Sequence, residues 1–258
     1  MRETDDCTGI LINSSDFISN VAHELRTPVA VLRGSLEALC DGVIYEKEQV
    51  EQYHRQMLSE SIYLQRLVTD LLELSRLNSS SFEIIREPVN LSDVVCDVCR
   101  SISRIAVQKN IAIIRESDNS VYIVNGDYAR LRQMLIVILD NAVKFTPEGG
   151  TVTVNQHKDS GKYKITVSDT GCGIAEDEIE NIFCRFHRLM SDANRNGSGL
   201  GLPIAREIAL RHDASIDVKS RLGKGTSFIF TFSSEMSRED ILYLNFRQTG
   251  NSIVCNYS

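Results

Sequence analysis

The stretch FISNVAHELRTPVAVLRGSLEAL, residues 17–39, places the strongest constraint on what this chain can fold into. One set of its residues recurs at alternating steps of three and four, and most members of the set are apolar. These residues are Ile18, Val21, Leu25, Pro28, Leu32, Ser35 and Leu39. The spacing predicts a helix with one narrow apolar seam, of the kind that packs against another helix as in a coiled coil.

Two residues of this predicted helix need a separate explanation. At about 100° per residue, His23 lies on the side opposite the seam, so we expect an exposed imidazole rather than a buried core histidine. Pro28 has no amide hydrogen, and the carbonyl of Glu24 therefore loses its helical partner. We expect a kink or a soft point there. The alternative is a tolerated proline without a role.

A second helix is predicted from about Glu46 to Leu77, after a stop at Asp41-Gly42. Its apolar side is predicted to contain Met57, Leu64, Val68, Leu71, Leu72 and Leu74. Two such helices form an antiparallel hairpin, which buries one stripe against the other and leaves much apolar surface in water. Two hairpins that pair as a four-helix bundle cover this surface, so we expect a homodimer.

The pattern changes after the polar segment 78–81, which predicts a domain boundary. Helices are expected at 91–109, 128–145 and 200–212, with strands at 111–115, 121–124, 151–157, 163–168, 215–220 and 227–232. Helices and strands that share one sheet indicate an α/β sandwich. The overall class is α+β, with a helical hairpin at 10–78, a second domain at 82–233 and a tail at 234–258 of no predicted structure.

Charge and cysteine usage exclude several classes of protein. The formal net charge of −7 argues against a nucleic-acid binder, whose affinity depends on neutralising phosphates. No apolar run approaches the roughly 18 residues that span a bilayer. Seven cysteines, an odd number and mostly isolated, do not suggest a disulfide framework. We expect a cytoplasmic location, either for a whole protein or for the soluble portion of a longer, membrane-anchored one.

Two glycine clusters, DTGCG at 169–173 and GSGLG at 197–201, are candidates for a ligand site. Glycine lets the backbone approach a ligand closely. The second cluster leads directly into a predicted helix, whose N-terminal amides favour a phosphate group. Taken singly, each cluster is more often a plain turn, and neither is a P-loop.

The predicted helix 128–145 carries a pair of polar residues, Asn141 and Lys144, on one face. An amide oxygen can bind Mg²⁺, and a lysine can neutralise a phosphate. Two solvated polar side chains on an amphipathic helix would give the same pattern.

Five motifs together favour one interpretation. In chain order they are HELRTP at 23–28, DNAVKFTP at 140–147, DTGCGI at 169–174, IFCRFHR at 182–188 and GSGLGL at 197–202. In type, order and spacing the set resembles the H, N, G1, F and G2 boxes of the sensor histidine kinases of two-component systems. The resemblance covers about residues 15–232. It implies a protein histidine kinase in which an Hsp90-like domain binds ATP and phosphorylates the histidine of a dimeric hairpin.

The resemblance also assigns roles within the first motif. His23 is implied to be the phospho-acceptor, which passes its phosphate to an aspartate of a response regulator. Glu24 is implied to polarise the imidazole or to take its proton. Thr27 matches the residue that positions water for dephosphorylation of the regulator in relatives.

The remaining motifs are implied to form the ATP and Mg²⁺ site. Asp169 would accept a hydrogen bond from the adenine amine, and Gly171 and Gly173 would bring the backbone close to the base. Asn141 would hold Mg²⁺, Lys144 would meet a phosphate oxygen, and Phe145 would form an apolar wall. The triphosphate would be wrapped by Gly197, Gly199 and Gly201. The loop 174–198 would be a lid that Phe183 and Phe186 anchor. Arg185 or Arg188 would be available to supply positive charge.

Three departures from the family pattern stand out. Val137 replaces a polar residue usual four positions before Asn141, which predicts a missing metal contact and weak kinase activity. Asp213-Ala214 stands where Gly-Gly is frequent, which affects a turn. Cys184 occupies a position that is often acidic, without a clear consequence.

Three other functions remain open at this point. The chain could act chiefly as a phosphatase of its regulator, given Val137. It could be an ATP-driven clamp of the Hsp90 or MutL kind, although a clamp has no need of the His-Glu-x-x-Thr-Pro hairpin. It could also be a dimeric scaffold without activity.

Overall fold

The computed structural model describes residues 14–79, 82–118, 121–188 and 197–233. The chain divides into two compact units. Within the described ranges, the first unit contains residues 14–76, 180–188 and 197–203, and the second contains the rest of residues 77–179 and 204–233.

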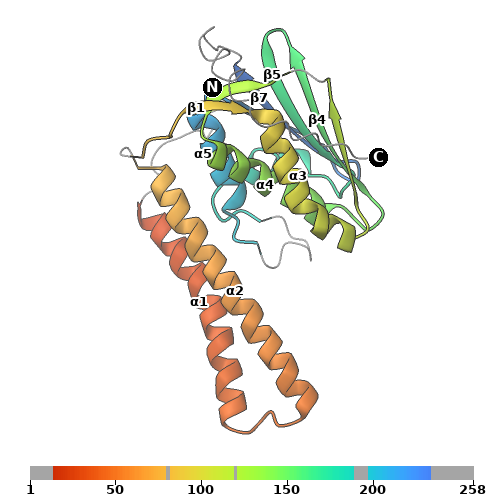
Figure 1. The fold of residues 1–258 in the computed structure, drawn as a ribbon. Coiled ribbons are helices and arrows are strands. Elements are labelled where there is room, and N and C mark those ends of the chain that lie inside the picture. Colours follow the sequence, from red (N-terminus) through yellow and green to blue (C-terminus); the bar gives the residue numbers. More distant parts are fainter. Residues whose placement is uncertain (1–13, 80–81, 119–120, 189–196, 234–258) are drawn as a thin grey trace, which may run out of the picture. The chain divides into compact units, whose positions relative to one another are not determined.

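The first unit is built on an antiparallel pair of helices, α1 (Ser14–Cys40) and α2 (Lys47–Leu77), shown in Figure 1. The predicted seam of α1 is correct, because Pro28 and Ser35 are buried and its other members except Ile18 are half-buried. The helix continues through Pro28. His23 is exposed, as its position opposite the seam predicts.

The predicted apolar side of α2 is wrong at two residues. Val68 and Leu72 are 44% and 58% exposed. The inward residues follow the same three- and four-residue steps as α1, and Leu67 and Leu74 are buried members of that series. The hairpin therefore keeps a set of exposed apolar side chains, namely Val29, Leu36, Leu58, Ile62 and Leu72.

The second unit contains a five-stranded mixed sheet with the order β2-β4-β5-β7-β6. Its strands are β2 (Ala112–Ser117), β4 (Thr151–Asp159), β5 (Lys162–Asp169), β6 (Ser215–Arg221) and β7 (Gly225–Ser233). β2 and β4 are parallel, and every other neighbouring pair is antiparallel. A separate antiparallel pair joins β1 (Glu87–Asn90) to β3 (Ile123–Gly126).

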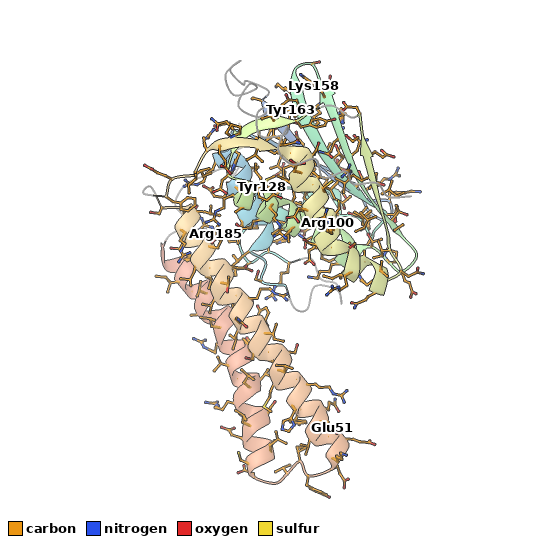
Figure 2. The ribbon with its side chains drawn as sticks, in the orientation of Figure 1. Glu51, Arg100, Tyr128, Lys158, Tyr163 and Arg185 are labelled. Atoms are coloured by element: carbon orange, nitrogen blue, oxygen red, sulfur yellow. The ribbon has the colours of Figure 1, made fainter. Side chains whose placement is uncertain are left out.

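Helices α3 (Leu91–Gln108), α4 (Tyr128–Phe145) and α5 (Gly201–Arg211) cover one face of the sheet (Figure 1). Alternate residues of the central strands are buried against them, as Val152, Val154, Ile165 and Phe230 illustrate. Figure 2 shows the side chains that fill this layer. The helical hairpin followed by an α/β sandwich confirms the predicted fold class.

Local sequence explains where the two long helices of this unit begin. Asn90 accepts a hydrogen bond from the amide of Ser92 at 3.1 Å, and Asp127 accepts one from the amide of Arg130 at 3.1 Å. The predicted limits of α4 match the observed limits at both ends. Strand β1 was not predicted, because it has only four residues and contains Pro88.

His212 joins the end of α5 to the start of α4. Its Nε2 accepts a hydrogen bond from the Asp127 amide at 3.0 Å, and Nδ1 lies 2.7 Å from the Ile208 carbonyl oxygen. Burial lowers the pKa of His212, so the ring is held neutral. The next residue, Asp213, has a φ of +54°, which locates the Asp213-Ala214 departure in a tight turn.

The segment that follows α2 packs on helices of the second unit through Phe82 and Arg86. The guanidinium groups of Arg130 and Arg211 lie 5.1 and 5.6 Å from the ring centroid of Phe82. Arg211 also donates to the carbonyl of Phe82 at 3.1 Å, and Arg86 forms an ion pair with Asp213 at 2.7 Å. Phe82 is therefore in contact with cations of both α4 and α5.

Across the described ranges, no helix has both the length and the apolar character that a bilayer crossing requires.

Candidate functional site

The first group of candidate residues lies on α1, with His23 at its centre. The His23 side chain is exposed. Thr27, one turn later, donates through its hydroxyl to the His23 carbonyl at 3.5 Å. Glu24 differs from its neighbours, because its side chain is only 18% exposed. The site therefore combines an accessible imidazole with a carboxylate largely shielded from water.

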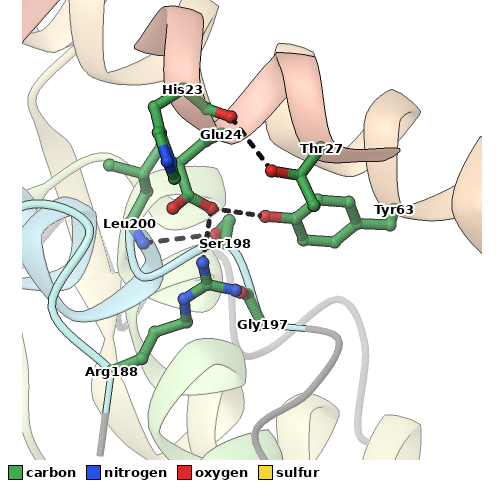
Figure 3. Close-up of polar contacts among 8 residues, drawn as sticks. All are labelled: His23, Glu24, Thr27, Tyr63, Arg188, Gly197, Ser198 and Leu200. Carbon is green, nitrogen blue, oxygen red and sulfur yellow. Dashed lines mark hydrogen bonds and ion pairs between the residues drawn. The ribbon is translucent and has the colours of Figure 1, made fainter. Parts of the chain in front are cut away.

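Two side chains from other segments explain how Glu24 is shielded (Figure 3). The Tyr63 hydroxyl on α2 donates to Glu24 Oε2 at 2.9 Å. The Arg188 guanidinium forms an ion pair with the same oxygen. A carboxylate that accepts from a phenol and a guanidinium at once is restricted far more than a free surface glutamate.

The segment that carries Arg188 makes further contacts with the hairpin. Ser198 donates to Asp70 of α2 at 2.6 Å. Burial raises the pKa of Asp70, and the hydrogen bond from Ser198 opposes this shift. The ring of Phe186 lies 6.0 Å from that of Phe17, centroid to centroid. Residues 180–188 and 197–203 are thus held to α1 and α2 by polar and aromatic contacts.

The second glycine cluster belongs to this segment, and Gly199 has a clear structural requirement. Its φ is +70°, and a Cβ there would lie 2.8 Å from backbone atoms of Phe186. The Phe186 amide donates to the Gly199 carbonyl at 3.0 Å. Gly197 accepts from Arg188 at 3.2 Å, and Gly201 begins α5. The part of the lid at 189–196 lies outside the described residues.

The second group of candidate residues surrounds Asp169 at the end of β5. Asp169 Oδ1 accepts from the amides of Gly171 at 2.8 Å and Thr226 at 3.2 Å. Burial raises the pKa of Asp169, and these two amides oppose the shift. One carboxylate oxygen is thereby fixed by the backbone, which leaves Oδ2 as the atom suited to accept from a ligand amine.

The glycines near Asp169 permit close backbone packing. A Cβ on Gly171 would lie 2.7 Å from both Asp169 Oδ1 and the Phe145 carbonyl. Gly173 has a φ of +69°, and a Cβ there would lie 2.1 Å from the Arg221 carbonyl. Both positions therefore exclude larger residues, and they keep the backbone close around Asp169.

Helix α4 supplies the remaining candidates. Asn141 is half-buried, and the Lys144 ammonium lies 5.2 Å from the ring centroid of Phe145. Val137 is also half-buried, one turn before Asn141. The amide oxygen of Asn141 suits Mg²⁺, and the cation of Lys144 suits a phosphate. These donors fit a magnesium nucleotide whose phosphates and waters complete the metal shell.

The structure brings the predicted residues together in two sets. His23, Glu24 and Thr27 form one, and Asp169 with Gly171 and Phe145 forms the other. Tyr63, Asp70 and Ser198 were not predicted from the sequence, and Arg188 was predicted only as one of two possible cations. The sequence around these four residues does not indicate which side chains they contact.

Comparison with known families gives two matches in chain order. The family described as "His Kinase A (phospho-acceptor) domain" matches residues 13–80. The family described as "Histidine kinase-, DNA gyrase B-, and HSP90-like ATPase" matches residues 126–236.

Two curated relatives align with most of the chain. Sensor histidine kinase WalK of Bacillus subtilis is 34% identical over 231 residues, and this match covers 87% of the chain. Sensor protein SrrB of Staphylococcus aureus is 31% identical over 226 residues, covering 83% of the chain. The chain spans 37% of the length of each of these relatives.

Solved structures share the fold. Histidine kinase ThkA, in a complex with response regulator protein TrrA, has a TM-score of 0.71 at 25% identity, over 85% of this chain and 61% of that chain. Full-length ShkA in complex with AMPPNP has a TM-score of 0.63 at 28% identity, over 86% of this chain and 47% of that one. Histidine kinase AdeS of Acinetobacter baumannii has a TM-score of 0.68 at 24% identity, over 83% and 98% of the two chains, which supports the fold alone.

Proposed function

Because the chain belongs to the sensor histidine kinases of two-component systems, we propose that it transfers the γ-phosphoryl group of ATP to His23. The phosphate then passes to an aspartate of a response regulator. The observation that carries this proposal is the exposed imidazole of His23 beside a carboxylate that Tyr63 and Arg188 hold in place.

The chemistry follows from the state of the two side chains. An imidazole is a nucleophile only when neutral, and its ordinary pKa near 6.5 keeps most histidines neutral at pH 7. A nitrogen of His23 forms the new bond to phosphorus, and the bond from that phosphorus to the bridging oxygen breaks. ADP leaves with the electron pair. Glu24 accepts the proton that the imidazole loses.

The nucleotide side of the reaction falls to the residues around Asp169 and on α4. Asp169 Oδ2 accepts from the adenine amine, since Oδ1 is taken by backbone amides. Phe145 lies against the base, and Lys144 meets a phosphate oxygen. Asn141 would hold Mg²⁺, which would supply positive charge to offset that of the phosphates. Gly197, Gly199 and Gly201 surround the triphosphate, where the N-terminal amides of α5 favour an anion.

We further propose that the working form is a homodimer. The hairpin carries apolar side chains in water, among them Val29, Leu36, Leu58 and Leu72, each more than half exposed. Packing against a second hairpin removes them from water, at about 25 cal/mol per Å² of apolar surface.

Dephosphorylation of the regulator is a second candidate activity. Thr27 supports it, because its hydroxyl is tied to the His23 carbonyl and so lies within one turn of the phosphosite. An ATP-driven clamp or an inactive scaffold is disfavoured, since neither needs an exposed histidine paired with a shielded glutamate.

Incubation of the chain with γ-labelled ATP and Mg²⁺, followed by acid treatment, tests the proposed function. We expect label that is lost in acid, as phosphohistidine requires. His23→Gln should take no label while its affinity for a non-hydrolysable ATP analogue stays unchanged. His54→Gln is the matched control, because His54 is also exposed but lies on α2. Label retained by the His23 variant would refute the assignment, and nucleotide binding without any labelling would favour the clamp or the scaffold.

A further inference from the structure

We propose that Tyr63 is a positioning residue, which holds the Glu24 carboxylate in the orientation that receives the proton from His23. This inference rests on the proposed function of Glu24 as proton acceptor. Tyr63 comes from α2 and lies in none of the five motifs, so no sequence pattern assigns it a role.

Burial and geometry both fix the Tyr63 hydroxyl against Glu24. Tyr63 is 8% exposed, and its hydroxyl donates to Glu24 Oε2 at 2.9 Å (Figure 3). A glutamate at a helix surface normally samples many rotamers, and ordering it costs about 1.5–2 kcal/mol. A donor on a buried ring, itself fixed by packing, restricts that freedom before the reaction begins.

The protonation state of Tyr63 also suits a fixed donor. Burial, together with the hydrogen bond to Glu24, raises the pKa of Tyr63 to about 12. The phenol therefore keeps its proton at neutral pH. Tyr63 acts as a constant donor and does not compete for the transferred proton.

Tyr63 differs from Arg188, the other partner of Glu24, in its place in the chain. Arg188 lies 164 residues along the chain from Glu24, in the segment that also bears the second glycine cluster. Tyr63 lies in the same hairpin as Glu24, so its contact is part of the hairpin itself. We infer that Tyr63 sets the direction of the carboxylate whether or not Arg188 is engaged.

Removal of the Tyr63 hydroxyl tests the role directly. Tyr63→Phe keeps the buried ring and deletes the donor, and Tyr53→Phe makes the same deletion at a half-buried tyrosine elsewhere on α2. Initial autophosphorylation rates of the full chain would be measured against ATP concentration and pH. We expect Tyr63→Phe to lower kcat about threefold to tenfold with KM for ATP unchanged, which corresponds to roughly 0.7–1.4 kcal/mol.

The pH profile distinguishes positioning from a merely structural role. The groups in contact with the Glu24 carboxylate are Tyr63 on α2 and Arg188 in segment 180–188, and His23 precedes Glu24 on α1. A lost donor disfavours the ionised carboxylate, so the acid limb of the rate profile should move to higher pH in Tyr63→Phe alone. Equal rates for the two tyrosine variants, or a rate loss with an unmoved acid limb and a matching fall in Tm, would overturn the proposal.

A readout that needs no kinase activity completes the test. The side-chain carboxyl carbon of Glu24 can be titrated by NMR in the wild type and in both tyrosine variants. A shifted titration in Tyr63→Phe only supports positioning even if no protein takes up label, in which case the proposed function alone fails. An unchanged Glu24 titration refutes the role of Tyr63, whatever the activity of the wild type.

Discussion

The hairpin and the α/β unit solve the problem of apolar burial in different ways. In the α/β unit, three helices cover one face of the sheet, and residues such as Leu139, Ile165 and Phe230 are fully buried within the chain. In the hairpin, Leu58 and Leu72 are 62% and 58% exposed although they lie near the middle and the end of a long helix.

The same contrast extends to the two candidate sites. Asp169 is oriented by backbone amides of its own unit, which do not change rotamer. Glu24 is oriented by two side chains, Tyr63 and Arg188, from distant parts of the chain. We infer that the nucleotide site is built into its fold, whereas the phosphosite combines a contact within the hairpin, from Tyr63, with one from Arg188 that can be made and broken.

The largest effect of a substitution is expected on the exposed apolar surface of the hairpin, where we propose that a second hairpin packs. Leu72→Glu places a charge on the exposed apolar side of α2, so the dimer should dissociate on the order of a hundredfold more readily. Analytical ultracentrifugation of the full chain measures this. Leu222→Glu is the control, because Leu222 is 69% exposed in the α/β unit and should leave the dimer intact. Similar dissociation constants for both variants would remove the proposed difference between the units.

A smaller loss is expected in the nucleotide site. Asn141→Ala should weaken binding of a non-hydrolysable ATP analogue about tenfold in Mg²⁺ and much less without it, since the amide is proposed to serve the metal. Calorimetric titration with and without Mg²⁺ gives the two affinities. Asp140→Ala, at an exposed neighbour on α4, controls for the change of helix surface. A Mg²⁺ dependence equal to that of the wild type would exclude the metal role.

Val137→Asn should produce a gain instead of a loss. The half-burial of Val137 leaves room for an amide to be hydrated, so a large cost in stability is not expected. The autophosphorylation rate should rise a few-fold at limiting Mg²⁺, and the gain should shrink at saturation. Initial rates across a Mg²⁺ titration, with a melting curve for each protein, would reveal it. Identical rates at every concentration would mean that Val137 does not weaken metal binding.

The smallest effect concerns pH and the buried His212. Its folded pKa is lowered, so the unfolded chain binds the proton more readily. The stabilisation is complete above the ordinary pKa of about 6.5 and is lost as pH falls through the lowered folded value. Chemical denaturation at several pH values should show this loss. His212→Gln should be less stable at pH 7 but show a shallower dependence, and parallel curves for both proteins would contradict the role of His212.

The sequence predicted the secondary structure well where periodicity is strong. Helix α4 has an aspartate cap and a glycine-rich stop, and its ends were predicted without error. Val68 and Leu72 were misassigned because apolar residues occur on both sides of α2, and periodicity alone does not say which side faces α1. The side of α2 that faces α1 is decided by the register between the two helices of the hairpin.

The register of the hairpin would also have identified Tyr63 as the partner of Glu24. Helix α1 ends at Cys40 and α2 begins at Lys47, so the midpoint of the turn is 43.5. Glu24 and Tyr63 are each 19.5 positions from it, and antiparallel helices place such residues opposite one another. The contacts of Arg188 and Ser198 were not predictable in this way, because they depend on where the loop after β5 returns.

The clamp on Phe82 determines how the chain enters the α/β unit. Residues 82–86 form neither helix nor strand. The guanidinium groups of Arg130 and Arg211 nevertheless lie 5.1 and 5.6 Å from the Phe82 ring centroid, and Arg211 donates to the Phe82 carbonyl. Each cation–π contact contributes about 0.5–2 kcal/mol, which disfavours local opening of the segment. Segments that open readily are the usual sites of proteolytic nicking, so this irregular segment should resist limited proteolysis.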